Sequence, residues 1–134
     1  PVVIYFYPKD NTPSSLRQVS HFSKAEEEFK KRCAEVVGIS RNLPKSHANF
    51  INKNDLCVTL LSDPSRDAIL KYNAWGKKNQ QGKGFVGVKR TTYIIDPNGI
   101  IKHRFKNVKI ASHVEEILEK LDELQSSSES KESK

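Results

Sequence analysis

The sequence has little that would cross-link a fold or anchor it to a membrane. Of its 134 residues only two are cysteines, Cys33 and Cys57. Their separation fits neither a CxxC redox motif nor a zinc site, and two cysteines are too few for a disulfide framework. No apolar run approaches the roughly 20 residues that a membrane-spanning helix needs. With no internal repeat either, the chain predicts one compact domain in a reducing compartment.

The opening residues also give no reason to expect a targeting signal. The opening residues, PVVIYFY, lack a basic region and a small-residue cleavage site, and therefore predict a strand rather than a signal peptide. We expect an intracellular protein, placed in the cytoplasm, the nucleus or an organelle. Because a fully apolar strand needs neighbours on both sides, we also expect one or two edge strands to precede residue 1.

Positive charge is in excess, with a formal net charge of +7. The lysines and arginines are scattered, and no RNA-binding signature accompanies them, which favours a solvated basic surface over a nucleic-acid partner. The polar end of the chain, residues 125–134, has no apolar periodicity and is predicted to be disordered. We therefore expect a folded domain over residues 1–124.

What is present is an alternation of strand and helix patterns. Val2 to Tyr7 is a continuous apolar run, typical of a buried strand, and a helical pattern follows from Leu16 to Phe29. The remaining expected elements are a strand at 35–40, a helix opening at Pro44, a strand at 58–61, a helix opening at 63–65, a glycine-rich connection over 75–89, a hairpin of 91–95 and 100–105 around Asp-Pro-Asn-Gly, and a helix capped by Ser112. Strands that alternate with helices imply parallel crossovers. The predicted class is therefore α/β with a thioredoxin-like fold: a central mixed sheet flanked by helices, ending in a hairpin and a helix.

The start of the first helix is the expected place for chemistry. In open α/β sheets, sites form beyond the carboxyl ends of the strands, and the first strand leads into a helix N-terminus near Ser14. Thr12, Ser14 or Ser15 can cap that helix. Free backbone N–H groups and a partial positive charge there stabilise an anion, and would lower the pKa of a cysteine.

The segment FYPKDNTPSSLRQVSHF resembles the active-site segment of the peroxiredoxins, in the peroxiredoxin Q or bacterioferritin comigratory protein branch, which typically reads like YPKDNTPGCTKQAC. The likeness extends from Val2 to Leu121 and includes EVVGIS, LLSDP, the Trp75-Gly76 pair and RTTYIIDPNG, in that order. Several segments in the right order make this resemblance specific.

The resemblance places the family's peroxidatic cysteine at Ser15 and its resolving cysteine, five positions later, at Ser20. It also implies that Pro8 shields the nucleophile, that Thr12 orients peroxide, and that Arg90 stabilises the thiolate and the developing anion. Taken alone, Pro8 could simply end a strand, Thr12 could only cap a helix, and Arg90 could be a surface residue.

Serine at position 15 removes the chemistry that the resemblance implies. An alcohol has a far higher pKa than a thiol, no base lies next to it in the sequence, and a sulfenic acid has no oxygen analogue. The chain as written is therefore predicted to reduce no peroxide. Serine at both cysteine positions favours a deliberate replacement, whereas Ser14 and Leu16, where the family has glycine and threonine, fit a naturally inactive relative equally well.

By resemblance, the expected function is that of a thioredoxin-dependent thiol peroxidase acting on hydrogen peroxide and alkyl hydroperoxides, without metal or haem, as a monomer or weak dimer. Cys33 and Cys57 remain alternative resolving thiols. The four histidines share no metal spacing and are predicted to lie at the surface or to cap helices. The rival hypothesis is a non-catalytic binding module, nuclear or associated with nucleic acid.

Overall fold

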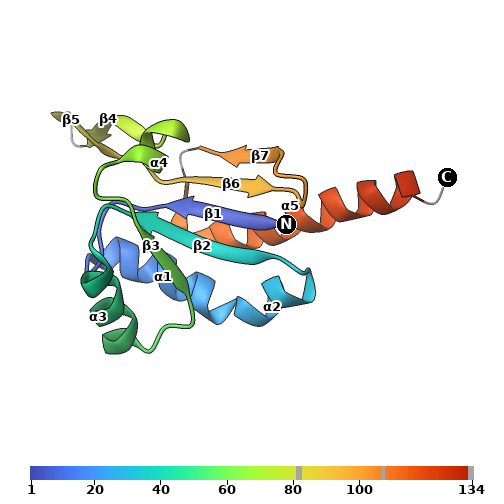
Figure 1. Cartoon of the computed structure of the whole chain (residues 1–134), viewed down its shortest axis with the longest axis horizontal. Helices are drawn as coiled ribbons and strands as arrows, with labels where there is room; N and C mark the ends of the chain where they lie inside the picture. The colour runs from blue at the N-terminus through green and yellow to red at the C-terminus, as the bar shows by residue number, and fades with distance from the viewer. Residues whose placement is uncertain (81–82, 107, 133–134) are drawn as a thin grey trace.

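A five-stranded mixed sheet forms the centre of the molecule, and the thioredoxin-like class is confirmed (Figure 1). The computed structural model describes residues 1–80, 83–106 and 108–132. The sheet order is β3-β2-β1-β6-β7, with β1 at Val2–Phe6, β2 at Glu35–Ser40, β3 at Thr59–Ser62, β6 at Thr91–Ile95 and β7 at Ile101–Phe105. β1 pairs with β2 in parallel and with β6 antiparallel, which makes it the central strand.

Alternate side chains of β1 and of Tyr7, which follows it, enter two separate cores. Val3, Tyr5 and Tyr7 face the larger core, which also receives Phe22 and Phe29. Phe6 faces a smaller core on the opposite side of the sheet, together with Ile69, Ala74 and Val88. Both faces of β1 are therefore buried, as the continuous apolar run predicts.

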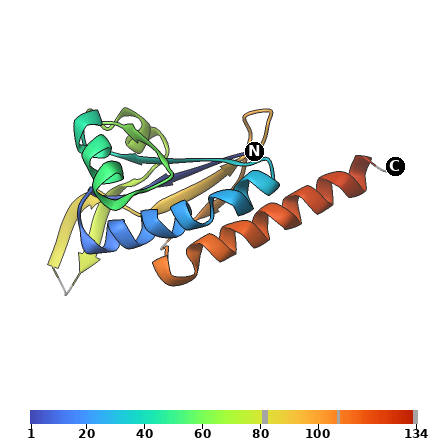
Figure 2. The same cartoon turned by 90° about the horizontal axis from the view of Figure 1, so that it is seen from below.

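Helices cover the larger core. They are α1 at Pro13–Lys24, α2 at Glu26–Lys31, α3 at Pro44–Asn54 and α5 at Ile110–Glu132, and α1 lies beside α5 (Figure 2). The opposite face carries the short helix α4, at Asp67–Lys71, and one end of a hairpin formed by two further strands. No described helix is long and apolar enough to cross a membrane.

Three local expectations are wrong. The predicted connection over 75–89 is a hairpin of β4, at Trp75–Gln80, and β5, at Lys83–Val88, in which Gly76 pairs with Gly87; Gly82 lies outside the described residues. The single helix expected from Leu16 to Phe29 is interrupted at Ala25, whose N–H is shared among carbonyls of the preceding turn. Ser112 is not the N-cap of the last helix, because α5 begins at Ile110, and the Ser112 hydroxyl donates to Glu116 within that helix.

The last helix also extends beyond the apolar pattern that predicts it. The Gln125 side chain donates to the Arg32 carbonyl oxygen at 2.7 Å, and the helical backbone continues to Glu132. The disordered tail expected over 125–134 remains a prediction. The edge strands expected before residue 1 also remain a prediction.

Two histidines that the sequence suggests are surface or capping residues are buried, and one of them couples stability to pH. His113 lies edge-on to Phe22 and Phe105, with Nε2 2.7 Å from the Thr92 hydroxyl and Nδ1 without a protein partner among the described residues. Burial lowers the pKa of His113 to about 4. The folded protein therefore binds this proton less readily than the unfolded chain does.

The free energy of unfolding should fall as the solution is acidified. The contribution of His113 is complete above the unfolded pKa near 6.5, and it declines by about 1.4 kcal/mol per pH unit until the pH reaches the folded value. Urea unfolding between pH 7 and pH 4.5 measures this slope, and a His113→Gln variant provides the matched control. Equal slopes in the two proteins would contradict the assignment.

Candidate active site

The start of α1 lies at the carboxyl end of the central strand. Pro13 occupies the first turn, where its missing N–H is not needed, and Thr12 is the N-cap. The Thr12 hydroxyl donates to the Lys9 carbonyl at 3.2 Å and accepts from the Ser15 N–H at 3.3 Å. The predicted cap by Thr12 is thus present, and it holds the backbone of residue 15.

Ser15 and Arg90 meet at this helix start although they are 75 positions apart in the sequence. Ser15 is fully buried, whereas its neighbour Ser14 is exposed. The Arg90 guanidinium donates from Nη2 to the Ser15 Oγ at 3.3 Å. Burial lowers the pKa of Arg90 from its ordinary value, but an arginine remains charged at any ordinary pH. A fixed positive charge therefore faces the residue-15 side chain.

Gln18 is a third member of this group, and the sequence patterns did not single it out. Its side-chain oxygen accepts a hydrogen bond from Arg90 Nη1, while its side chain is almost completely buried. Gln18 lies three positions after Ser15, one turn along the same helix face, so the spacing could have revealed it. By holding one edge of the guanidinium, Gln18 aims the other edge at residue 15.

Two further predicted site residues, Pro8 and Ser20, belong to the segments on either side of the start of α1. Pro8 directly follows the carboxyl end of β1, and it is partly buried. Ser20 lies within α1, five positions beyond Ser15, and is also partly buried. No hydrogen bond joins Ser20 to Ser15 in the described part of the chain.

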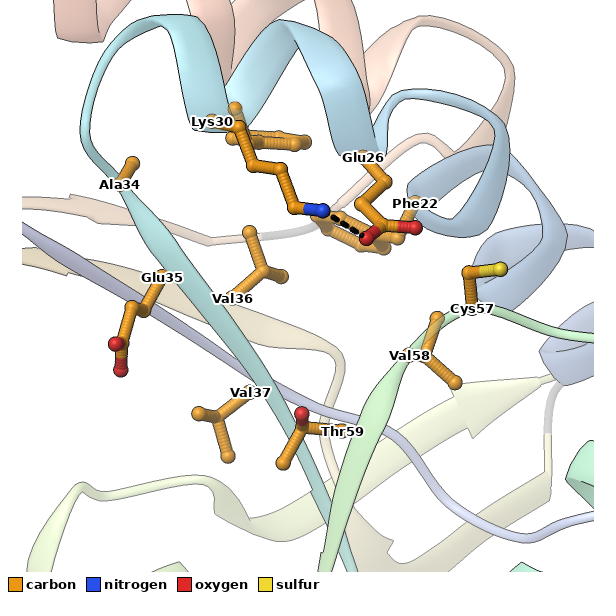
Figure 3. Close-up of a pocket in the computed structure, with 11 residues that line it drawn as sticks. Phe22, Glu26, Lys30, Ala34, Glu35, Val36, Val37, Cys57, Val58 and Thr59 are labelled. Atoms are coloured by element: carbon orange, nitrogen blue, oxygen red, sulfur yellow. Dashed lines mark ion pairs between the residues drawn. The ribbon is translucent and has the colours of Figure 1, made fainter.

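The two cysteines lie away from these contacts. Both are exposed and unpaired, and Cys33 has a left-handed backbone just after α2. Cys57 lies at the rim of a pocket of about 550 Å³ between α2 and the starts of β2 and β3, beside the Glu26–Lys30 ion pair (Figure 3). A hydrogen bond to the Glu26 carboxylate raises the pKa of Cys57, so this thiol is held in its less nucleophilic form.

The arrangement suits the reaction of an anionic nucleophile with a small polar molecule. A helix N-terminus and a guanidinium both stabilise negative charge at residue 15, and burial excludes water from it. No group of three histidine, cysteine or carboxylate side chains converges as a metal site among the residues that the structure describes.

Comparison with known proteins identifies the class. Residues 1–104 match the model of the AhpC/TSA family, and the chain belongs to that family. It is 35% identical over 122 residues to the peroxiredoxin Bcp of Escherichia coli K12, covering 91% of this chain and 78% of that protein. A Bcp sequence of Helicobacter pylori is 43% identical over 120 residues, with 90% and 79% coverage.

Solved structures point to the same branch. The bacterioferritin comigratory protein of Xanthomonas campestris, described in connection with its alkyl peroxide reduction, has a TM-score of 0.84 and 36% identity, covering 90% of this chain and 77% of that one. A cysteine-to-serine mutant of Xylella fastidiosa PrxQ has a TM-score of 0.86 and 33% identity, with 92% and 77% coverage. The resemblance to the peroxiredoxin Q branch is confirmed.

Proposed function

We propose that the chain has the site of a thioredoxin-dependent thiol peroxidase for hydrogen peroxide and alkyl hydroperoxides, with Ser15 in place of its nucleophilic cysteine. The observation that carries this proposal is the contact between Arg90 and the buried Ser15 side chain at the start of α1. Relatives named peroxiredoxin support the peroxidase class. As it stands, the chain does not reduce peroxide.

The proposed chemistry needs sulfur at position 15. A thiolate there attacks one oxygen of the peroxide, the O–O bond breaks, and the leaving oxygen takes a proton to become water or an alcohol. The products are a sulfenic acid on the protein and the reduced peroxide. Arg90 and the N–H groups of α1 stabilise the negative charge that passes from sulfur to the leaving oxygen. A serine alkoxide is inaccessible at neutral pH, and no described side chain of the site acts as a base on Ser15.

Restoring the sulfur tests the proposal. A Ser15→Cys variant should consume one equivalent of hydrogen peroxide and then react with a sulfenate-trapping reagent, whereas the unmodified chain should do neither. Ser14→Cys is the matched control, because it adds a thiol one residue away on the exposed side of the helix start. If Ser15→Cys is no faster than Ser14→Cys, the site is not a peroxidase site, and the non-catalytic hypothesis takes its place.

A further inference from the structure

A buried polar cluster lies beside the candidate site and takes no part in its contacts. Asp10, in the loop between β1 and α1, has one carboxylate oxygen 2.6 Å from the Tyr7 hydroxyl. Its other oxygen accepts from the Ser46 hydroxyl and contacts His47 Nδ1, both at 2.8 Å. Asp10, His47 and Tyr7 are each at most 3% exposed. We call this cluster of Tyr7, Asp10, Ser46 and His47 the loop anchor.

Hydrogen bonds fix both the His47 ring and the Asp10 carboxyl group in the loop anchor. His47 Nε2 is 3.1 Å from the Leu61 carbonyl oxygen, which can only accept, so Nε2 carries a proton. The contact between His47 Nδ1 and the Asp10 carboxylate needs a second proton. Burial acts to raise the pKa of Asp10, but hydrogen bonds from His47, Tyr7 and Ser46 outweigh it and hold that pKa below its usual range. A buried hydrogen bond therefore joins the Asp10 carboxyl group to the His47 ring.

The loop anchor fixes the segment from which the candidate site is built. Pro8 and Thr12 flank Asp10, and the intervening Asn11 adopts a left-handed backbone, with φ of 62°. The Asp10 N–H also donates to the Asn42 side chain at 2.9 Å, which ties the loop to the segment after β2. Hydrogen bonds from α3 and from the segment after β2 thus hold the loop at its midpoint. Thr12, two residues further on, caps the turn that carries Ser15.

We propose that Asp10 and His47 are positioning residues: their buried hydrogen bond holds the β1–α1 loop in the one conformation that lets Thr12 cap α1 and turns residue 15 toward Arg90. The consequence for catalysis rests on the proposed function, whereas the effect on the first turn of α1 does not. Neither residue touches the reacting atoms.

The effect of Asp10 and His47 on the first turn of α1 can be tested in the chain that has serine at position 15. Amide hydrogen exchange at Ser15 and Leu16 reports the first turn, because their N–H groups bond to the Thr12 hydroxyl and carbonyl. Asp10→Asn and His47→Leu should each speed this exchange at least tenfold. Leu121→Ala is the control, because it removes a buried core side chain of α5 without touching the loop. Exchange at Ser15 and Leu16 no faster than in Leu121→Ala would overturn the proposal.

A milder variant and a double variant test the same proposal in two further ways. Ser46→Ala removes one hydrogen bond to Asp10 and should speed the exchange at Ser15 and Leu16 by a smaller factor. This variant keeps the test possible if Asp10→Asn and His47→Leu fail to fold. Asp10→Asn combined with His47→Leu removes both partners of one hydrogen bond, so its effect should be smaller than the sum of the single changes. Additive effects would show that the two residues act independently, against the proposal.

The link to catalysis needs a separate readout. In the Ser15→Cys background, Asp10→Asn should raise the pKa of the introduced thiol and lower its rate with peroxide about tenfold, whereas Leu121→Ala should leave that pKa unchanged. An unchanged thiol pKa in Asp10→Asn would overturn the positioning role. If Ser15→Cys itself never reacts with peroxide while exchange at Ser15 and Leu16 still responds to Asp10→Asn, the proposed function fails and the loop anchor stands.

Discussion

A chain that carries both Ser15→Cys and Ser20→Cys should reduce hydrogen peroxide through many cycles when thioredoxin is supplied, whereas Ser15→Cys alone should stop after one. The sulfenic acid at position 15 condenses with the thiol at position 20, which forms a disulfide and releases water. The two thiols of thioredoxin then reduce this disulfide. Coupled oxidation of the reductant, followed at excess peroxide, measures the number of cycles.

A disulfide between positions 15 and 20 cannot form while α1 is an intact helix. Positions 15 and 20 are separated by about 7.5 Å along the axis of an α-helix and face different directions, whereas disulfides join Cα atoms about 4.4–6.8 Å apart. The first turns of α1 must therefore unwind in each cycle. Ser15→Cys with Ser23→Cys is the matched control, because it places the second thiol almost another turn further away. Turnover by Ser15→Cys alone that Cys57→Ser abolishes would assign the resolving role to Cys57 instead.

Removing the guanidinium should have the second large effect. In the Ser15→Cys background, Arg90→Met should lower the second-order rate constant with hydrogen peroxide by about 10²–10³-fold, as expected when one donor that stabilises transition-state charge is lost. It should also raise the pKa of the introduced thiol, because the positive charge that contacts the residue-15 side chain is gone. Stopped-flow mixing over a range of pH measures both quantities.

The control for Arg90→Met is Arg17→Met, which removes the same charge from an exposed position of α1 two residues beyond Ser15. A general effect of net charge would change both variants alike. Only the direct contact of Arg90 with residue 15 predicts a large difference between them. Similar rates in the two variants would mean that Arg90 does not stabilise the reacting atoms.

Patterns local to the sequence predict most of the fold. The continuous apolar run of β1 marks a strand buried on both faces, and it is one. Asp96 and Gly99 predict the turn between β6 and β7: the Asp96 carboxylate accepts from two backbone N–H groups of the turn, and Gly99 adopts a φ of 81°. The β4–β5 hairpin could not be predicted this way, because lysine and glycine replace the alternating apolar residues that reveal a strand.

The candidate site likewise contains residues that the sequence predicts and residues that it does not. Thr12 and Ser15 follow from the helix start, and the resemblance adds Arg90. The hydrogen bond of Asp10 with His47 has no local signal, since its members are 37 positions apart and each, taken alone, looks like a solvated polar residue. Only the fold, which brings the β1–α1 loop against α3, shows that the two side chains are buried together.

Because the helix is interrupted at Ala25, α1 can open separately from α2, which the first part of one continuous helix could do less easily. Opening of the segment Pro13–Lys24 breaks its own backbone hydrogen bonds, but it need not propagate into α2, because a new helical unit starts at Glu26. Phe29 can then keep its place in the larger core while the first turns of α1 open and close. For a chain that carries Ser15→Cys and Ser20→Cys, the expected unwinding would then be confined to the 12 residues of α1.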